Sequence, residues 1–124
     1  MRTTITVWNL PPEQLGRLRW LGHQLRAEVK AASPREAGVP LRLVVSAPEE
    51  SAEGETPFPE TLLLLSGFEG GQLDRFLAGC REAGLAHGAY KAVLTPSNRQ
   101  WTAVQLMGEL REERAALEGA GRKG

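Results

Sequence analysis

The chain has little cysteine, no net charge and no long apolar run, and each of these features excludes a class of protein. Its single cysteine, Cys80, excludes an internal disulfide, and neither of the two histidines lies at metal-ligand spacing from it. Fifteen basic and fifteen acidic residues leave no net field to attract nucleic acid or an anionic membrane. We therefore expect no metal, no cofactor, no nucleic-acid partner and no membrane partner.

Apolar runs long enough to span a membrane are missing, since such a helix needs about 18 residues or more. The first residues have the pattern of a strand and lack the basic, apolar and small-residue regions of a signal sequence. A length of 124 residues is that of one ordinary domain, large enough to form a core without disulfides. We expect one soluble, cytoplasmic domain over residues 1–124.

Apolar periodicity, interrupted by proline and glycine, predicts most of the helices and strands. Four consecutive leucines at 62–65 are typical of a central strand covered on both faces. An apolar stripe at helical spacing runs from Leu73 to Cys80, and Gly84 is placed to end that helix. Besides this helix, the pattern predicts strands at 3–10, 61–68 and 89–95 and helices at 12–26 and 102–118.

The second strand has two candidates. Residues 26–32 alternate charged and apolar side chains, and residues 41–45 form a short apolar run. Both fit the same place in a sheet, and the sequence does not rank them. Between them, Ser33 to Glu36 are expected to cap a short helical turn that ends before Gly38.

An acidic stretch divides the chain into two parts. Residues 46–60 carry five glutamates, three prolines and no basic residue, a composition too polar to bury a core of its own. We interpret residues 46–59 as a flexible acidic loop that joins halves at about 1–45 and 60–118. A basic partner is the alternative use of this charge, but charge runs are usually solvated connections.

The two halves echo each other. Residues 14–18 (QLGRL) align with residues 72–76 (QLDRF), and each segment follows a strand and a turn. Two βαβ units of this layout predict an α+β or α/β fold, with the ferredoxin-like βαββαβ arrangement and an added C-terminal helix. A fold assigned in this way carries no function by itself.

Residues 91–102 (KAVLTPSNRQWT) are the most distinctive stretch. Pro96 ends the preceding strand because it has no N–H to donate to a sheet. Thr102 and Gln105 have the spacing of a capping box, in which each side chain binds the other residue's backbone N–H. The last helix should then turn four apolar residues inward, namely Leu106, Met107, Leu110 and Leu117.

The second half resembles an uncharacterised bacterial family that is catalogued as a domain of unknown function. The resemblance is carried by residues 62–68 (LLLLSGF), 73–77 (LDRFL) and 91–102, and it runs from Glu60 onward with a fainter match before it. The turn Glu69-Gly70-Gly71 departs from the acidic or polar helix start that the family has. Because the family has no known activity, the resemblance implies no catalytic residue.

A ligand would have to be bound by polar residues of the distinctive stretch. Open α/β sheets tend to bind ligands at the carboxyl ends of strands, where this connection lies. Arg99 offers a planar fork for a carboxylate or phosphate, and Asn98 offers a donor and an acceptor. The candidate ligand-binding residues are Lys91, Thr95, Ser97, Asn98 and Arg99. The competing interpretation is that Ser97, Asn98 and Arg99 only cap and turn the chain.

Two functions follow from these observations. The favoured one is a non-enzymatic regulatory or protein-interaction domain, whose partner is another protein or a second copy of the chain. The alternative is a sensor of a small anionic ligand, or a minor enzyme, that uses residues 95–99 together with Lys91 and the turn at 67–71. A pocket joining Lys91, Ser97, Asn98 and Arg99 would favour the alternative.

Overall fold

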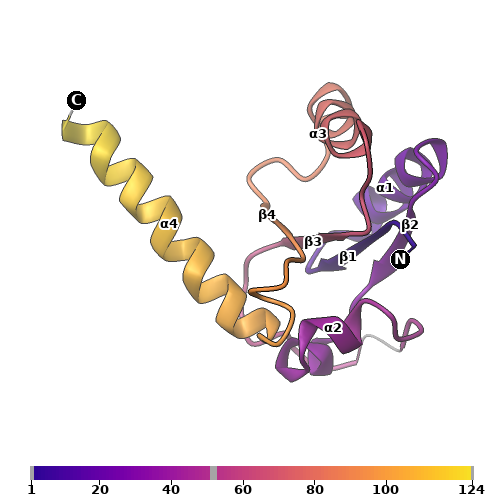
Figure 1. The fold of residues 1–124 in the computed structure, drawn as a ribbon, viewed down its shortest axis with the longest axis horizontal. Coiled ribbons are helices and arrows are strands. Elements are labelled where there is room, and N and C mark those ends of the chain that lie inside the picture. The colour runs from indigo at the N-terminus through magenta and orange to yellow at the C-terminus, as the bar shows by residue number, and fades with distance from the viewer. Residues whose placement is uncertain (1, 51–52, 124) are drawn as a thin grey trace.

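Two βαβ units lie side by side and form one sheet in the computed structural model, which describes residues 2–50 and 53–123 (Figure 1). The first unit consists of β1 (Thr4–Trp8), α1 (Pro12–Gln24) and β2 (Glu28–Ala31). The second consists of β3 (Leu62–Ser66), α3 (Gln72–Ala83) and β4 (Tyr90–Val93). The predicted end of α3 is confirmed, because Gly84 follows it with a φ of 66° in the left-handed region.

The sheet is mixed, with the strand order β2-β1-β3-β4. Each unit pairs its own two strands in parallel, and β1 and β3 join the units as antiparallel neighbours, with Thr6 opposite Leu64. An α+β fold with a mixed sheet is therefore confirmed. The ferredoxin-like strand order is not confirmed. That arrangement splits its βαβ units, whereas here β1 and β2 are direct neighbours.

The second strand is β2, which lies within the 26–32 candidate. The other candidate was wrong, since residues 41–45 contribute a short helix, α2 (Leu41–Val44). Leu41 and Val44 are both buried while Leu43 between them is exposed, which is the spacing of one helix face rather than of a strand. Pro40 at the start of this helix lacks an N–H, so it would contribute no hydrogen bond at the start of a strand.

A short helical turn, η1 (Pro34–Gly38), comes between β2 and α2, as the sequence predicted. The Glu36 carboxylate accepts a hydrogen bond of 2.9 Å from the Ser33 N–H and of 2.7 Å from the Lys30 ammonium. Lys30 also donates to the Val44 carbonyl at 2.6 Å. The buried ion pair between Lys30 and Glu36 thus links η1 and α2 to β2.

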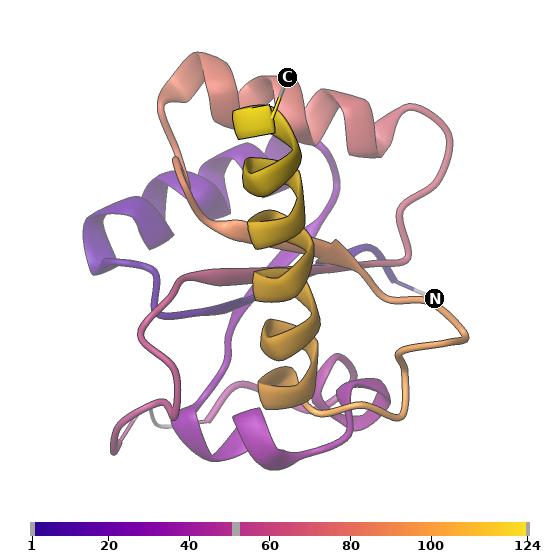
Figure 2. The same ribbon diagram turned by 90° about the vertical axis from the view of Figure 1, so that its left-hand side faces the viewer.

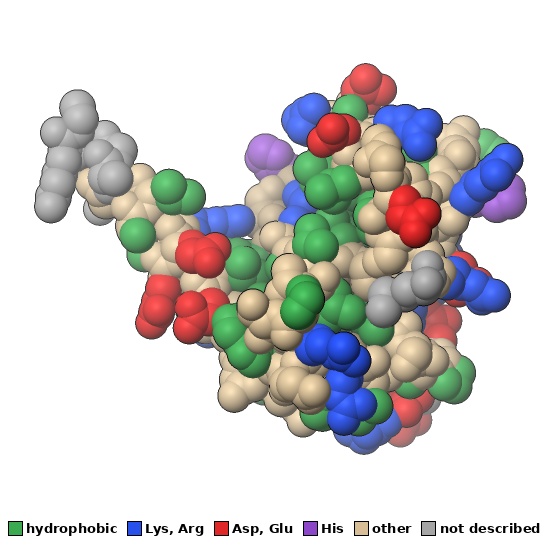
Figure 3. Space-filling model, in the orientation of Figure 1, with side chains coloured by type: hydrophobic (Ala, Val, Ile, Leu, Met, Phe, Trp, Pro, Cys, Tyr) green, Lys and Arg blue, Asp and Glu red, His purple; other side chains and the backbone are tan. Residues whose placement is uncertain are grey.

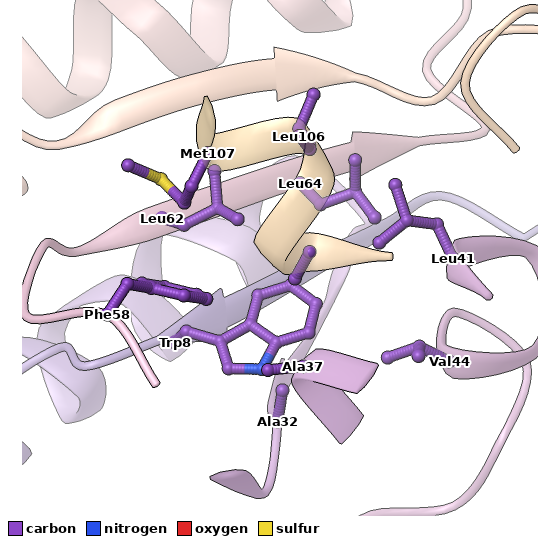
Figure 4. Close-up of a cluster of buried hydrophobic side chains, with 11 residues drawn as sticks. Trp8, Ala32, Ala37, Leu41, Val44, Phe58, Leu62, Leu64, Leu106 and Met107 are labelled. Atoms are coloured by element: carbon purple, nitrogen blue, oxygen red, sulfur yellow. The ribbon is translucent and has the colours of Figure 1, made fainter. Parts of the chain in front are cut away.

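The sheet separates two apolar cores (Figure 2). Helices α1 and α3 cover one face, where Leu18 and Phe76 pack on the inward side chains of β1 and β3. The other face is covered by η1, α2 and the start of the last helix, α4 (Ala103–Lys123). On this face Trp8 lies in the middle of the cluster, beside Phe58 and below Leu64 (Figure 4).

The start of α4 has the predicted capping box. The Thr102 N–H donates to Gln105 Oε1 at 2.8 Å, and the Gln105 N–H donates to Thr102 Oγ1 at 3.2 Å. Both interactions satisfy N–H groups that a helix start leaves without partners. The local sequence therefore fixes where α4 begins.

The later turns of α4 leave the body of the domain (Figures 1 and 3). Arg114 still contacts the body, because its guanidinium lies 3.6 Å from the centre of the Tyr90 ring. One turn further on, Leu117 has 74% of its surface exposed. The prediction that Leu117 faces inward was wrong, because the helix extends beyond the sheet that it packs on.

The acidic connection contains no helix or strand in its described part, residues 46–50 and 53–61. Several of its side chains nevertheless contact the body. Glu49 pairs with Arg19, Glu50 pairs with Arg35, and Phe58 is 3% exposed in the core beside Trp8. Its described residues are therefore fastened to the domain at both ends.

Candidate functional site

The two edge strands of the sheet, β2 and β4, differ in how their outer backbone groups are satisfied. At β2, the Arg19 guanidinium donates to the Val29 carbonyl at 2.7 Å. The Glu49 carboxylate accepts from the Ala31 N–H at 2.7 Å, and it also pairs with Arg19 at 2.7 Å. One ion pair therefore occupies the Val29 carbonyl and the Ala31 N–H, which are an acceptor and a donor that a further strand would need at β2.

The contribution of the Arg19 to Glu49 pair to stability should depend on pH. The Ala31 N–H, followed by the Arg19 guanidinium, lowers the pKa of Glu49 below its ordinary value. A lowered pKa in the folded state means that the ionised carboxylate stabilises the fold above the unfolded-state pKa, and that this contribution is lost as the pH falls through the folded-state pKa.

Glu49→Gln should therefore lower the free energy of unfolding at pH 7 by no more than about 1 kcal/mol, because the pair is partly exposed. Urea denaturation at a series of pH values would measure this difference, which should vanish in acid. A difference that stays constant down to acid pH would contradict the role of the charge. Glu53→Gln, an exposed position of the same segment, is the matched control.

At β4 the outer groups are largely open. The Tyr90 N–H donates to the Thr61 carbonyl, and the Leu94 N–H donates to a carbonyl of β3. The alternate residues Lys91 and Val93 therefore have their backbone N–H and C=O groups on the outer side of β4. The Asn98 amide donates to the Val93 carbonyl at 3.0 Å. Among the residues that the structure describes, none binds the Lys91 N–H, the Lys91 carbonyl or the Val93 N–H.

A groove of about 300 Å³ lies along this open edge, with α4 as its opposite wall. Leu106 and Leu110 form the apolar part of that wall. Glu109 and Glu113, one helical turn apart, give it an acidic rim. Among the described residues neither glutamate forms an ion pair. Figure 3 shows acidic side chains along the part of α4 that stands away from the body.

The groove brings together four of the five predicted ligand-binding residues, Lys91, Thr95, Ser97 and Asn98. It does not include Arg99, which lines a separate hollow. The Lys91 ammonium donates to the Ala86 carbonyl at 3.2 Å. Burial raises the pKa of the Cys80 thiol, against a smaller and opposite effect of the Lys91 charge. Cys80 is therefore a core residue and not an activated nucleophile.

Asn98 holds the connection between β4 and α4 in place. It is buried, its Oδ1 accepts from the Thr95 N–H at 2.8 Å, and its backbone N–H donates to Thr95 Oγ1 at 3.2 Å. Together with the bond to the Val93 carbonyl, these contacts engage both the oxygen and the nitrogen of the Asn98 side-chain amide. Thr95 and Asn98 therefore shape the turn between β4 and α4.

The glycine turn at 67–71 lies at the same end of the sheet, because β3 and β4 are parallel neighbours. Its helix start is satisfied locally, since Gln72 Oε1 accepts from the Glu69 N–H at 2.8 Å. The Gln72 amide also donates to the Leu25 carbonyl at 3.0 Å. None of the residues that line the groove or the Arg99 hollow belongs to this turn.

Arg99 shares its hollow with a residue that the sequence did not single out, Arg42. The hollow has a volume of about 250 Å³. The Arg42 N–H donates to the Arg99 carbonyl at 2.9 Å, which brings together the backbones of two arginines distant in sequence. Only the pairing of α2 with the 99–101 segment places them side by side, so no local signal marks Arg42.

The largest hollow, about 830 Å³, lies at the amino end of β1 and β2. Its charged side chains include Arg2 and Glu28, which pair at 2.7 Å, and the Arg19 to Glu49 pair that closes β2. The acidic side chains there, Glu28 and Glu49, are already paired, and Arg42 lines this hollow as well as the one that it shares with Arg99. We interpret this hollow as a solvated ionic surface rather than a binding site.

Comparison with known proteins finds a family model that matches part of the chain. Residues 61–117 match the family model described as Domain of unknown function (DUF3783). The predicted resemblance to an uncharacterised domain family is thereby confirmed. No curated protein and no solved structure matches the chain. The DUF3783 segment holds β3, α3, β4 and α4 as far as Leu117, so both walls of the groove lie within it.

Among the residues that the structure describes, no group of three or more histidine, cysteine, aspartate or glutamate side chains is placed to hold a metal ion. Within the same residues, no helix has both the length and the apolar character needed to cross a membrane.

Proposed function

We propose that this protein is a non-enzymatic protein-binding domain that takes an extended segment of its partner as a fifth strand beside β4. The observation that carries the proposal is the difference between the two edges. The Arg19 to Glu49 pair blocks β2, whereas the outward groups of Lys91 and Val93 stand open along a groove. An open edge beside a side-chain groove is the arrangement that strand addition uses.

The walls of the groove define the partner's chemistry. An added strand would turn alternate side chains toward α4, where the Leu106 and Leu110 surface would cover an apolar one. Glu109 and Glu113 would pair with basic ones. Successive side chains of a strand point to opposite faces, so we expect a segment whose α4-facing positions, every second residue, include both a small apolar or β-branched side chain and a lysine or arginine.

A second copy of the chain fits this groove less well than a basic segment does. Pairing β4 with β4 of another copy would bring a second α4, with its own Glu109 and Glu113, toward the first. Like charges placed opposite each other are destabilising. The charge of the groove therefore favours a different protein as the partner.

The polar groups of the 95–99 connection also support binding over catalysis. Thr95 and Asn98 are engaged with each other, and the Lys91 ammonium is engaged with a carbonyl. A catalytic acid, base or nucleophile needs a group that is free to exchange a proton or attack. These three side chains instead position the backbone of the open edge.

The test is a fluorescence-anisotropy titration with a labelled peptide that carries valine and lysine in turn at its α4-facing positions, with threonine at the positions between them. We expect saturable binding, weakened by about tenfold or more in the Glu109→Lys/Glu113→Lys double variant, since a tenfold change needs only about 1.4 kcal/mol. Glu112→Lys is the matched control, because Glu112 is exposed on the same helix but does not line the groove.

Val93→Pro tests the backbone part of the interaction. It removes the outward N–H of an edge residue that is 42% exposed, a position where a strand tolerates proline. We expect it to abolish peptide binding while circular dichroism stays that of the wild type. Equal binding by wild type and Val93→Pro, or equal binding of a valine and glutamate peptide, would refute strand addition in this groove.

A further inference from the structure

We propose that Arg42 and Arg99 form a second binding site, which takes a small organic acid with a short apolar tail. The site lies around the carboxyl end of β4, on the α2 side of the connection that leads to α4. It is separate from the β4 groove, although Thr95 lines both hollows.

The first support is the placement of two positive charges. The backbone bond of 2.9 Å between Arg42 and Arg99 keeps both side chains at one hollow. Among the described residues that line it, none carries a carboxylate. Like charges held together repel each other, and an anion between them relieves that repulsion. Figure 3 shows basic side chains gathered over the region of α2, with apolar side chains beside them.

The second support is the orientation of the Arg42 guanidinium. Its Nε donates to Gln100 Oε1 at 3.0 Å, which fixes the plane of the group. The terminal nitrogens have no hydrogen-bond partner among the described residues. A guanidinium with a fixed plane and free terminal nitrogens binds a carboxylate with two parallel hydrogen bonds.

The third support is the apolar lining below the two charges. Val45, Leu94 and Pro96 form most of that lining. A bare inorganic anion would leave this surface uncovered, whereas a carboxylate with a short hydrocarbon tail would cover it. The volume of about 250 Å³ lies below the range of about 300–1,000 Å³ of pockets for drug-sized ligands, so the ligand must be small.

The experiment is a two-dimensional NMR titration of the full chain with pentanoate, observed at the amides of Arg42, Thr95 and Arg99. We expect saturable shifts with a Kd of about 1 mM or below. Pentanamide, which has the same tail without the charge, and inorganic phosphate, which has charge without a tail, should each bind at least about tenfold more weakly.

Variants identify the groups responsible. Arg42→Gln and Arg99→Gln should each weaken pentanoate binding by about tenfold or more, since a hydrogen bond to a charged group is lost. Arg81→Gln, at an exposed arginine of α3 that does not line the hollow, should have no effect. The Glu109→Lys/Glu113→Lys variant should also bind pentanoate normally, which separates this site from the groove.

Three results would overturn the proposal. The first is the absence of saturable shifts with pentanoate. The second is equal binding of pentanoate and either pentanamide or phosphate, which would remove the need for one of the two features. The third is unchanged binding in both Arg42→Gln and Arg99→Gln.

Discussion

Glu36→Gln is expected to lower the free energy of unfolding at pH 7 by about 3–5 kcal/mol. The substitution keeps the size of the side chain and an oxygen for the Ser33 N–H, but it removes the charge opposite Lys30. The side chains of this pair are only 8% and 2% exposed, so the Lys30 ammonium would be left buried without its counter-charge. Urea denaturation of wild type and variant measures the loss.

A double-mutant cycle tests the explanation. Lys30→Met should also be costly by itself, because it leaves the Glu36 carboxylate buried and unpaired. The double variant Lys30→Met/Glu36→Gln should be much less destabilised than the sum of the two, since neither charge is then buried alone. Strict additivity would contradict a direct buried pair.

The exposed pair between Arg35 and Glu50 provides the control. Its side chains are 65% and 39% exposed. Because water screens such a pair, Glu50→Gln should cost about 1 kcal/mol at most. A cost as large as that of Glu36→Gln would mean that burial does not decide the effect.

Trp8→Ala is expected to cost about 3–5 kcal/mol, the range for deleting a large aromatic side chain from a packed core. Trp8 is 1% exposed and lies between Phe58 of the acidic connection and the leucines of β3. Its removal would open a cavity that touches both halves of the chain. Thermal and urea denaturation would both measure the loss.

Two tryptophan variants make this prediction sharper. Trp20→Ala should change stability by no more than about 0.5 kcal/mol, because Trp20 is 65% exposed. Trp8→Phe should be much milder than Trp8→Ala. It keeps an aromatic ring, and the indole nitrogen that it removes has no hydrogen-bond partner among the described residues. A large cost for Trp20→Ala would show that the assignment of burial is wrong.

The features that the sequence predicted are those with local causes. The capping box at Thr102 and Gln105, the end of α3 at Gly84 and the short turn after Ser33 each depend on side chains within a few residues. The run of leucines in β3 predicted a central strand, because a strand buried on both faces needs apolar side chains at every position.

What could not be predicted depends on contacts between distant segments. The strand order follows from which strands pair, and the apolar pattern of β1 and β2 fits more than one order. Leu117 repeats the spacing of its helix, but only the end of the sheet decides that it is exposed. Arg42 joins Arg99 through a backbone bond between α2 and a segment far along the chain.

The structure divides the candidate residues between two hollows. Lys91, Thr95, Ser97 and Asn98 line one groove, while Arg99 faces another hollow. Sequence reasoning located the connection because proline and a helix cap define it. It missed Glu109 and Glu113, whose charges look like an ordinary solvated helix face until β4 is placed opposite them.

The closure of β2 sets an upper limit on how this sheet can grow. A domain with two open edges could join copy after copy, β4 of one beside β2 of the next, into a filament without end. Here the Arg19 to Glu49 pair makes β2 a terminus, so an added strand at β4 completes the sheet. Under the proposed function, each domain would therefore take one added strand, at β4.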